Sequence, residues 1–282
     1  MNNLRILDVS IDAIRTDDAL VKIGQLMNKR SASIITTTNT EFIMQAQNSP
    51  EFKSILNKES SLNLPDGIGI LWAARFDKVK IPSNPTLAYP FLVLTWLFFI
   101  FLIPFGRNFF KNPIPEKISG SDFIWPLARF AAEKKYRLFL LGGAPTIAER
   151  AALKLQTDIY GLNISGVYSG KADEIDAIVN AVNKSKAEIL LVAFGSPKQE
   201  IWLKNNLKKT CCKLGIGLGG TFDFIAGAQN RAPIWMQRGG LEWLYRLIMQ
   251  PTRLKRQINI PIFMWRVLMH KLQECQKDIK QA

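Results

Sequence analysis

Two short polar segments carry side chains that could take part in chemistry. Thr37 and Asn39 follow a β-branched run at residues 32–37, and their hydroxyl and carboxamide groups could hydrogen-bond a sugar. Asp66 lies in a Pro-Asp-Gly turn, and its carboxylate could act as a general base. Structural interpretations compete with these roles. Thr38 or Asn39 could simply cap the next helix, and the Asp66 segment could be only a tight turn.

Glycines and polar groups follow three later apolar runs. The pairs Gly142-Gly143 and Gly219-Gly220 could each let backbone N–H groups approach a diphosphate. Neither pair matches the G-x-G-x-x-G dinucleotide motif or the P-loop, so a standard site of either kind is excluded. A third run ends at Gly195, and the segment Gly-Ser-Pro-Lys-Gln-Glu that starts there offers polar groups suited to a nucleotide.

Arginines near the C-terminus form a third group. Arg246, Arg253 and Arg256 are spaced by seven and three residues, which predicts that they share one helical face. Converging guanidinium groups of this kind are well suited to phosphate oxygens. Arg231 lies upstream, in an Arg-Ala-Pro segment.

The elements that would position these residues alternate along the chain. Strands are expected at 32–37, 137–141, 162–167, 188–194 and 213–218, and helices at 41–56, 145–160, 174–183 and 201–208. The alternation predicts an α/β fold with a parallel sheet and helices on both of its faces. Open sheets of this kind bind their ligands beyond the carboxyl ends of the strands, where the polar segments recur.

An apolar insertion at about residues 82–113 interrupts this pattern. Residues 81–106 contain no charged side chain, and the aromatic content is high. Only 13 residues separate Pro90 from Pro104, about 20 Å as a helix, against a hydrocarbon core of about 30 Å. A single crossing would also place the two halves of the sheet on opposite sides of a membrane. We therefore expect the insertion to dip into one leaflet, re-entrant or interfacial, with a buried core helix as the alternative.

The C-terminal appendage, residues 229–282, is basic. From residue 231 onward there are 10 Lys and Arg against 3 Asp and Glu, which is half of the net charge of +14. Trp, Leu and Ile alternate with the bases, which predicts amphipathic helices broken near Pro251 and Pro261 and a surface that meets anionic lipid. The alternative is an ordinary solvated basic face.

Composition narrows the chemistry further. The only histidine is His270, which argues against a histidine-based zinc site, a Ser-His-Asp triad or a Cys-His dyad. The positive charge indicates an anionic partner, which could be nucleic acid, a phosphate-bearing substrate or a membrane surface. The N-terminal residues lack the apolar core of a secretory signal, so a cytoplasmic start is expected.

Taken together, the motifs resemble the WecG/TagA/CpsF glycosyltransferase family. The resemblance covers nearly the whole chain except about residues 82–113. The motifs that carry it are Thr37-x-Asn39-x-Glu41, Pro65-Asp66-Gly67-Ile68-Gly69, Ser119-Gly120-Ser121-Asp122, Leu141-Gly142-Gly143, Gly195-Ser196-Pro197-Lys198-Gln199-Glu200, the run from Gly217 to Gly227, Arg231-Ala232-Pro233, and the run from Gly240 to Arg246.

The resemblance implies a Rossmann-like α/β enzyme with a catalytic domain at residues 1–228. Such an enzyme transfers a sugar from a UDP-sugar to a polyprenyl-diphosphate-linked sugar at the cytoplasmic face of the membrane. N-acetylmannosamine transfer in teichoic-acid linkage-unit synthesis and related exopolysaccharide steps belong to this family. By similarity, Asp66 is the base, Thr37 the essential threonine beside it, and Asn39 a residue of the same pocket. Where the family has an arginine before Ser119-Gly120, this chain has Lys117, which keeps the charge but lacks the bidentate fork.

The expected site residues fall into three groups. Asp66, Thr37 and Asn39 are expected to be catalytic. Lys117, Arg231, Arg246, Arg253 and Arg256 are expected to bind substrate and diphosphate, the last three as arginines of an appendage that closes over the site. The expected nucleotide-binding residues are Gly142, Gly143, Gly195, Pro197, Gln199, Glu200, Gly219, Gly220 and Asp223.

No metal or other cofactor is expected. Many sugar transferases hold a metal with an Asp-x-Asp motif, and the chain contains no such triplet. Arginines and backbone N–H groups could stabilise the departing diphosphate instead. Two other classes compete with an enzyme: a nucleic-acid-binding protein would explain the charge, and a non-catalytic membrane scaffold would explain the insertion. Nucleic acid is not expected as a partner, and a homo-oligomer is left open.

Overall fold

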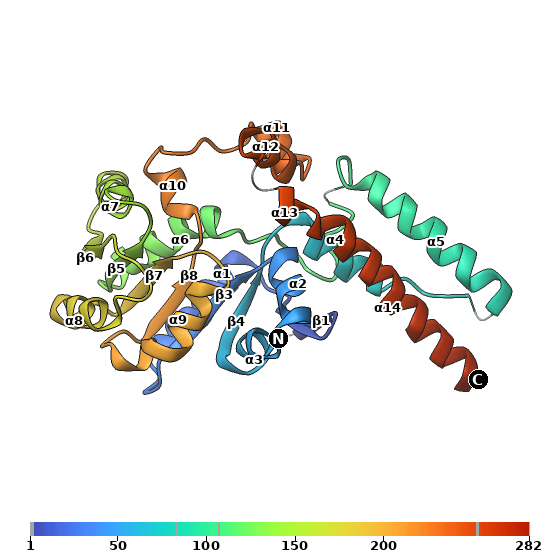
Figure 1. The fold of residues 1–282 in the computed structure, drawn as a ribbon, viewed down its shortest axis with the longest axis horizontal. Coiled ribbons are helices and arrows are strands. Elements are labelled where there is room, and N and C mark those ends of the chain that lie inside the picture. Colours follow the sequence, from blue (N-terminus) through green and yellow to red (C-terminus); the bar gives the residue numbers. More distant parts are fainter. Residues whose placement is uncertain (1–2, 83, 107, 252–253, 282) are drawn as a thin grey trace.

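The fold is built on a parallel sheet, as the alternating pattern predicts. The computed structural model describes residues 3–82, 84–106, 108–251 and 254–281. Its six-stranded sheet has the order β4-β3-β8-β7-β5-β6, with every neighbouring pair parallel (Figure 1). The strands are β3 (Ser33–Thr38), β4 (Ser60–Pro65), β5 (Arg137–Gly142), β6 (Asn163–Tyr168), β7 (Ile189–Ala193) and β8 (Leu214–Gly217).

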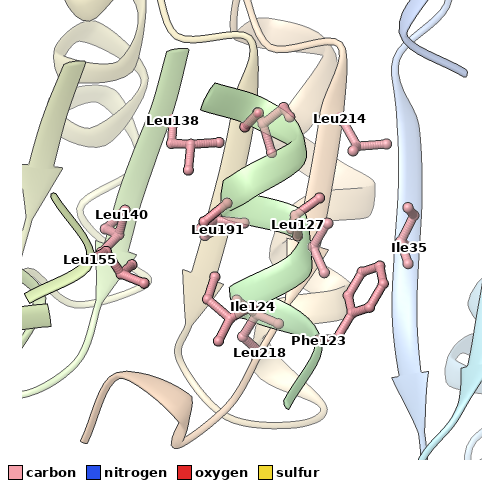
Figure 2. Close-up of a cluster of buried hydrophobic side chains, with 14 of the residues drawn as sticks. Ile35, Phe123, Ile124, Leu127, Leu138, Leu140, Leu155, Leu191, Leu214 and Leu218 are labelled. Atoms are coloured by element: carbon pink, nitrogen blue, oxygen red, sulfur yellow. The ribbon is translucent and has the colours of Figure 1, made fainter. Parts of the chain in front are cut away.

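Helices cover both faces of the sheet. Successive strand residues point to opposite faces, so Leu138 and Leu140 join one core while Phe139 and Leu141 join another. The first core lies under α1 (Thr16–Met27), α6 (Gly120–Glu133) and α7 (Ile147–Asp158). Figure 2 shows α6 laying its apolar side chains over the sheet. The second core lies under α8 (Ile175–Ser185) and α9 (Lys198–Asn206), with a 3₁₀ turn at Leu207–Lys209.

The region that precedes β4 differs from its prediction. The single helix expected at 41–56 is α2 (Thr40–Asn48), α3 (Pro50–Ser54) and a π-helical turn (Ile55–Glu59). The break falls at Ser49, whose side chain caps α3, and Pro50 occupies the first helical turn, where its missing N–H costs nothing. The hairpin of β1 (Asn3–Ile6) and β2 (Val9–Asp12), strand β4 and α4 (Ile68–Asp77) were not predicted.

The apolar insertion forms one helix, α5 (Pro85–Leu102). It starts before Pro90 and continues through it, so the helix is longer than the stretch between Pro90 and Pro104. Pro90 lies in the second turn, and the Asn84 side chain caps the helix by accepting from the Thr86 N–H at 3.0 Å. Ala88, Leu92 and Phe99 are buried, but many other apolar side chains of α5 are exposed, so α5 is not a core helix. Within the described ranges, no helix has both the length and the apolar character needed to span a membrane.

The C-terminal appendage is helical, as predicted. It follows α10 (Thr221–Ile225) and contains α11 (Ile234–Arg238), α12 (Glu242–Met249), α13 (Leu254–Gln257) and α14 (Asn259–Gln281). The helices are interrupted near Pro251 and again three residues before Pro261, close to both expected breaks. Pro261 lies in the first turn of α14, where a proline is tolerated, and the break is at Ile258.

The long helix α14 is part of a third core. Phe263, Val267 and Leu268 are buried together with side chains of α2, α4 and α5. Figure 1 shows α14 (red) and α5 (teal) side by side, extending away from the sheet. The appendage is therefore packed onto the α/β body rather than tethered to it.

Candidate active site

The predicted polar segments gather at one edge of the sheet. In strand order, this edge carries Asp66 after β4, Asn39 after β3, Gly219 after β8, Gly195 after β7 and Gly143 after β5. All strands are parallel, so their carboxyl ends, and the residues that follow them, share this edge. Two hollows open here, one around Asp66 and one around the glycines.

The first hollow, called here the Asp66 pocket, lies between the α/β body and the C-terminal helices. It encloses about 1270 Å³, part of it open to solvent. Its lining residues are Asn39, Thr40, Glu41, Asp66, Gly67, Ile68, Gly69, Leu71, Ile103, Lys117, Gln237, Arg238, Gly240, Glu242, Trp243, Arg246, Arg256, Gln257, Ile260 and Met264.

Asp66 is held at the end of β4 by its own backbone, since its N–H donates to the Thr38 carbonyl at 2.9 Å. Desolvation raises the pKa of its carboxyl from 3.8 to about 6, against the opposing charges of Lys117 and Arg246. The carboxyls of Glu242 and Asp122 add to the rise in this pKa. A carboxylate with a pKa near 6 is mostly ionised at neutral pH and can still accept a proton efficiently.

Lys117, the residue that departs from the family pattern, lies in the same pocket. The N–H of Ile118 donates to the Pro65 carbonyl at 2.8 Å, which fixes this segment next to Asp66. Among the charges that act on Asp66, Lys117 is the strongest in lowering its pKa. The lysine therefore keeps a cation at the place where one is expected.

Two arginines of the appendage share one carboxylate. Arg246 Nη2 lies 3.1 Å from Glu242 Oε1, and its guanidinium stacks over the Phe224 ring at 4.9 Å from the centroid. Arg231 Nη2 lies 3.7 Å from the same oxygen, and Arg231 also pairs with Asp122. Arg246 lines the pocket, whereas Arg231 lies outside its lining and connects the appendage to α6.

Arg256 lines both hollows. Its Nε lies 3.3 Å from Glu41 Oε1, so it also links α13 to α2. The prediction that the arginines share one helical face is wrong, because Arg246 is on α12 and Arg256 on α13. The break near Pro251 brings them together instead. Arg253 lies outside the described residues.

The second hollow, called here the nucleotide groove, crosses the ends of β5, β7 and β8. It is lined by Gly143, Ala144, Gly170, Lys171, Ala172, Asp173, Ile175, Ala193, Phe194, Gly195, Lys198, Ile201, Trp202, Asn205, Asn206, Gly219, Gly220, Asp223 and Arg256. Gly143, Gly195 and Gly219 have φ of 85°, 77° and 54°, which favour glycine. Gly142 lies just below the lining, and a Cβ there would come within 2.9 Å of Phe194.

Gln199 and Glu200 are buried beneath the groove and do not line it. Gln199 Oε1 accepts from the Gly219 N–H at 2.9 Å, and its Nε2 donates to Glu200 Oε1 at 2.6 Å. Burial raises the pKa of the Glu200 carboxyl to about 7. The pair therefore supports the Gly219 loop from below. Pro197 precedes α9 and also lies outside the lining.

Thr37 and Asn39 have structural partners. The Thr37 hydroxyl is buried and donates to the Gly217 carbonyl at 3.3 Å, and Thr37 lines neither hollow. Asn39 Oδ1 accepts from the Phe42 N–H at 3.1 Å, so the helix-cap interpretation is confirmed, although Asn39 also lines the Asp66 pocket. The catalytic roles of both residues stay predictions.

Glu242 and Asp122 were missed as site residues. Their carboxylates hold Arg231 and Arg246 and act on the pKa of Asp66. Glu242 had a signal in the sequence, since it precedes Arg246 by four residues and such a pair meets on a helix. Asp122 pairs with Arg231 across 109 residues, which no local spacing indicates.

The described residues contain no cluster of three His, Cys, Asp or Glu side chains that could hold a metal ion. The sequence-based expectation of a metal-free reaction stays a prediction.

A comparison with known families decides the class of this site. The sequence profile of the glycosyl transferase WecG/TagA/CpsF family matches residues 4–94 and 102–277. The chain belongs to this family. It is therefore a glycosyltransferase, which favours an enzyme over a nucleic-acid-binding protein or a scaffold. Only residues 95–101, inside α5, interrupt the match, so the departure from the family is shorter than the predicted 82–113.

Two relatives carry a more specific name. The N-acetylglucosaminyldiphosphoundecaprenol N-acetyl-beta-D-mannosaminyltransferase of Bacillus subtilis (strain 168) is 27% identical over 242 residues, 86% of this chain and 81% of the relative. The enzyme of the same name from Bacillus spizizenii is 25% identical over 245 residues, 87% of this chain and 82% of the relative. Both matches extend over the sheet and the appendage together.

Proposed function

We propose that this glycosyltransferase moves N-acetylmannosamine, or a related hexose, from a UDP-sugar to a sugar carried on a polyprenyl diphosphate. Two similar enzymes are named for such a transfer onto an undecaprenol-linked acceptor. The observation that carries the proposal is the meeting of one carboxylate, Asp66, with Lys117, Arg246 and Arg256 in a pocket that adjoins a glycine-lined groove.

In the proposed reaction, Asp66 takes the proton of the acceptor hydroxyl. The hydroxyl oxygen attacks the anomeric carbon as the bond from that carbon to the UDP oxygen breaks. The electron pair of the broken bond stays on the diphosphate, and attack from the opposite side inverts the anomeric configuration. A pKa of about 6 leaves Asp66 ionised before the step and able to hold the proton after it.

The charge that develops on the departing diphosphate needs a counter-charge. Arg256 lines both hollows and so lies where the donor and acceptor sites meet. The glycine turns at Gly143, Gly195 and Gly219 let the main chain approach a ligand closely. We propose that these groups replace a metal ion and that the reaction is metal-independent.

We also propose that the enzyme associates with an anionic membrane surface at the cytoplasmic face. A lipid-linked acceptor requires access to a bilayer, and scattered apolar residues are normal on a surface whereas a large apolar patch is not. The exposed apolar residues of α5 and the C-terminal helices are Leu87, Tyr89, Phe91, Val93, Leu94, Leu97, Phe98, Phe101, Ile234, Trp235, Trp243, Ile248, Met249, Leu254, Ile262, Trp265 and Met269.

A donor screen tests the proposal. The purified enzyme in detergent receives a panel of UDP-sugars and a prenyl-diphosphate-linked N-acetylglucosamine, with release of UDP as the readout. We expect acceptor-dependent release with one or a few donors, unchanged by EDTA. Release of UDP that requires added Mn²⁺ or Mg²⁺ would refute the metal-independent mechanism. A panel without any acceptor-dependent release would refute the proposed substrates.

A further inference from the structure

The lining of the Asp66 pocket contains two chemically different sets of side chains. Asp66, Lys117, Arg246 and Arg256 suit a sugar hydroxyl and a diphosphate. The second set, called here the apolar wall, consists of five side chains from three elements: Ile68 and Leu71 of α4, Ile103 at the end of α5, and Ile260 and Met264 of α14.

The apolar wall is connected to the two projecting helices. Trp96, in the middle of α5, donates its Nε1–H to the Met264 carbonyl at 3.0 Å. The rings of Trp96 and Trp265 meet edge to face with centroids 6.5 Å apart. The helices α5 and α14 are thus joined directly beside the wall, and Figure 1 shows the two helices side by side.

Apolar surface continues beyond the pocket. Ile262 and Trp265 of α14 are exposed, the latter by 55%. Phe101 and Phe105, on either side of the wall residue Ile103, are 69% and 77% exposed. An apolar surface of this kind is costly in water unless a ligand or another apolar surface covers it. The wall and the outer faces of the two helices therefore offer apolar contacts from the pocket interior to the outside.

We infer that the apolar wall binds the first isoprene units of the acceptor's lipid carrier. This inference rests on the proposed function and deepens it. A polyprenyl diphosphate joins a doubly charged head directly to a branched hydrocarbon chain, so its site needs cations and apolar side chains in one hollow. A nucleotide sugar has no hydrocarbon chain that would require the wall. The wall thus distinguishes lipid-linked acceptors from soluble ones.

Substitutions in the wall test the inference. Ile260→Ser and Met264→Ser change side chains that are only partly buried, so we expect both variants to fold. Each is assayed with two acceptors that carry the same sugar diphosphate, one on a farnesyl chain and one on a methyl group. We expect KM for the farnesyl acceptor to rise about tenfold while both constants for the methyl acceptor stay unchanged, because only the hydrocarbon contact is lost.

Two further variants separate this site from other effects. Leu153→Ser is the matched control, because Leu153 of α7 is 68% exposed. It should leave kcat and KM unchanged for both acceptors. Leu94→Ser, on the outer face of α5, should weaken binding to anionic phospholipid vesicles and leave the preference for farnesyl over methyl in detergent intact. The inference would be overturned if the wall variants lost kcat/KM equally with both acceptors. It would also be overturned if the wild-type enzyme did not prefer the farnesyl acceptor.

A binding measurement keeps the inference separate from the proposed function. Calorimetry with farnesyl diphosphate, which has no sugar, needs no donor and no turnover. We expect wild-type binding, and about tenfold weaker binding for Ile260→Ser. If no UDP-sugar supports transfer but farnesyl diphosphate binds in this way, the proposed function fails and the inference stands. If transfer proceeds with no chain preference and no farnesyl diphosphate binding, the inference fails alone.

Discussion

The nucleotide groove and the Asp66 pocket adjoin at one edge of the sheet, yet they are built differently. The groove is lined mostly by residues of the α/β body, with glycines of positive φ at the ends of β5, β7 and β8, and among the described residues only Arg256 reaches it from the C-terminal helices. The pocket is lined by residues from the body and from α12, α13 and α14. The pocket therefore depends more than the groove on the docking of the C-terminal helices. Single side-chain changes should affect the pocket far more than the groove.

The largest effect is expected for Asp66→Asn. The substitution keeps the size of the side chain but removes the proton acceptor, so kcat should fall by about 10²–10⁴-fold while UDP still binds. Initial rates of UDP release and calorimetry with UDP measure the two quantities. Asp158→Asn, on the outer side of α7, is the matched control. A fully active Asp66→Asn enzyme would show that the pocket does not supply the base.

Arg256→Ala should affect both regions, because this side chain lines both hollows. We expect kcat/KM to fall about 10–100-fold, which is the usual cost of a lost charge-assisted hydrogen bond. Weaker binding of UDP should accompany it. Arg129→Ala, on the exposed face of α6, provides the control. A change confined to the acceptor KM would assign Arg256 to the pocket alone.

The pH profile tests the electrostatics of the pocket. With a pKa of about 6, Asp66 should lose activity as a base below pH 6, by about tenfold per unit. Lys117→Gln removes the cation that most strongly lowers this pKa, so the midpoint should move to higher pH. Rates from pH 5 to 9 measure it, with Lys134→Gln as the control. A midpoint that stays or moves down would contradict the placement of Lys117.

The smallest effect on activity is expected for Glu200→Gln, beneath the groove. The pKa of Glu200 rises from 4.5 to about 7 in the folded protein, so its contribution to stability is present at low pH and lost as pH rises through this range. Between pH 5 and 8, the free energy of unfolding of the variant should increase relative to that of the wild type, by about 3 kcal/mol at most. Thermal melts at several pH values measure this difference, with Glu133→Gln as the control. A difference that does not change with pH would contradict the burial of the Glu200 carboxyl.

The same contrast explains what the sequence could predict. Apolar runs that end in glycine indicated the groove, because strand and turn are encoded by neighbouring residues. Arg246 and Arg256 lie on two separate helices, α12 and α13, and not on one helical face, so the residues were identified but their arrangement was not. Strand β4 was missed although Asp66 directly follows it. Its polar residue Asn63 is buried, and its side-chain amide donates to the Ser10 and Leu56 carbonyls, which no periodicity reveals.

The hydrogen bond from the Trp96 indole to the Met264 carbonyl links the projecting helix α5 directly to a residue of the Asp66 pocket. Force applied to the outer end of α5 would act on Met264, which lines the Asp66 pocket. On the proposed membrane surface, turnover would then respond to how tightly the surrounding lipids pack.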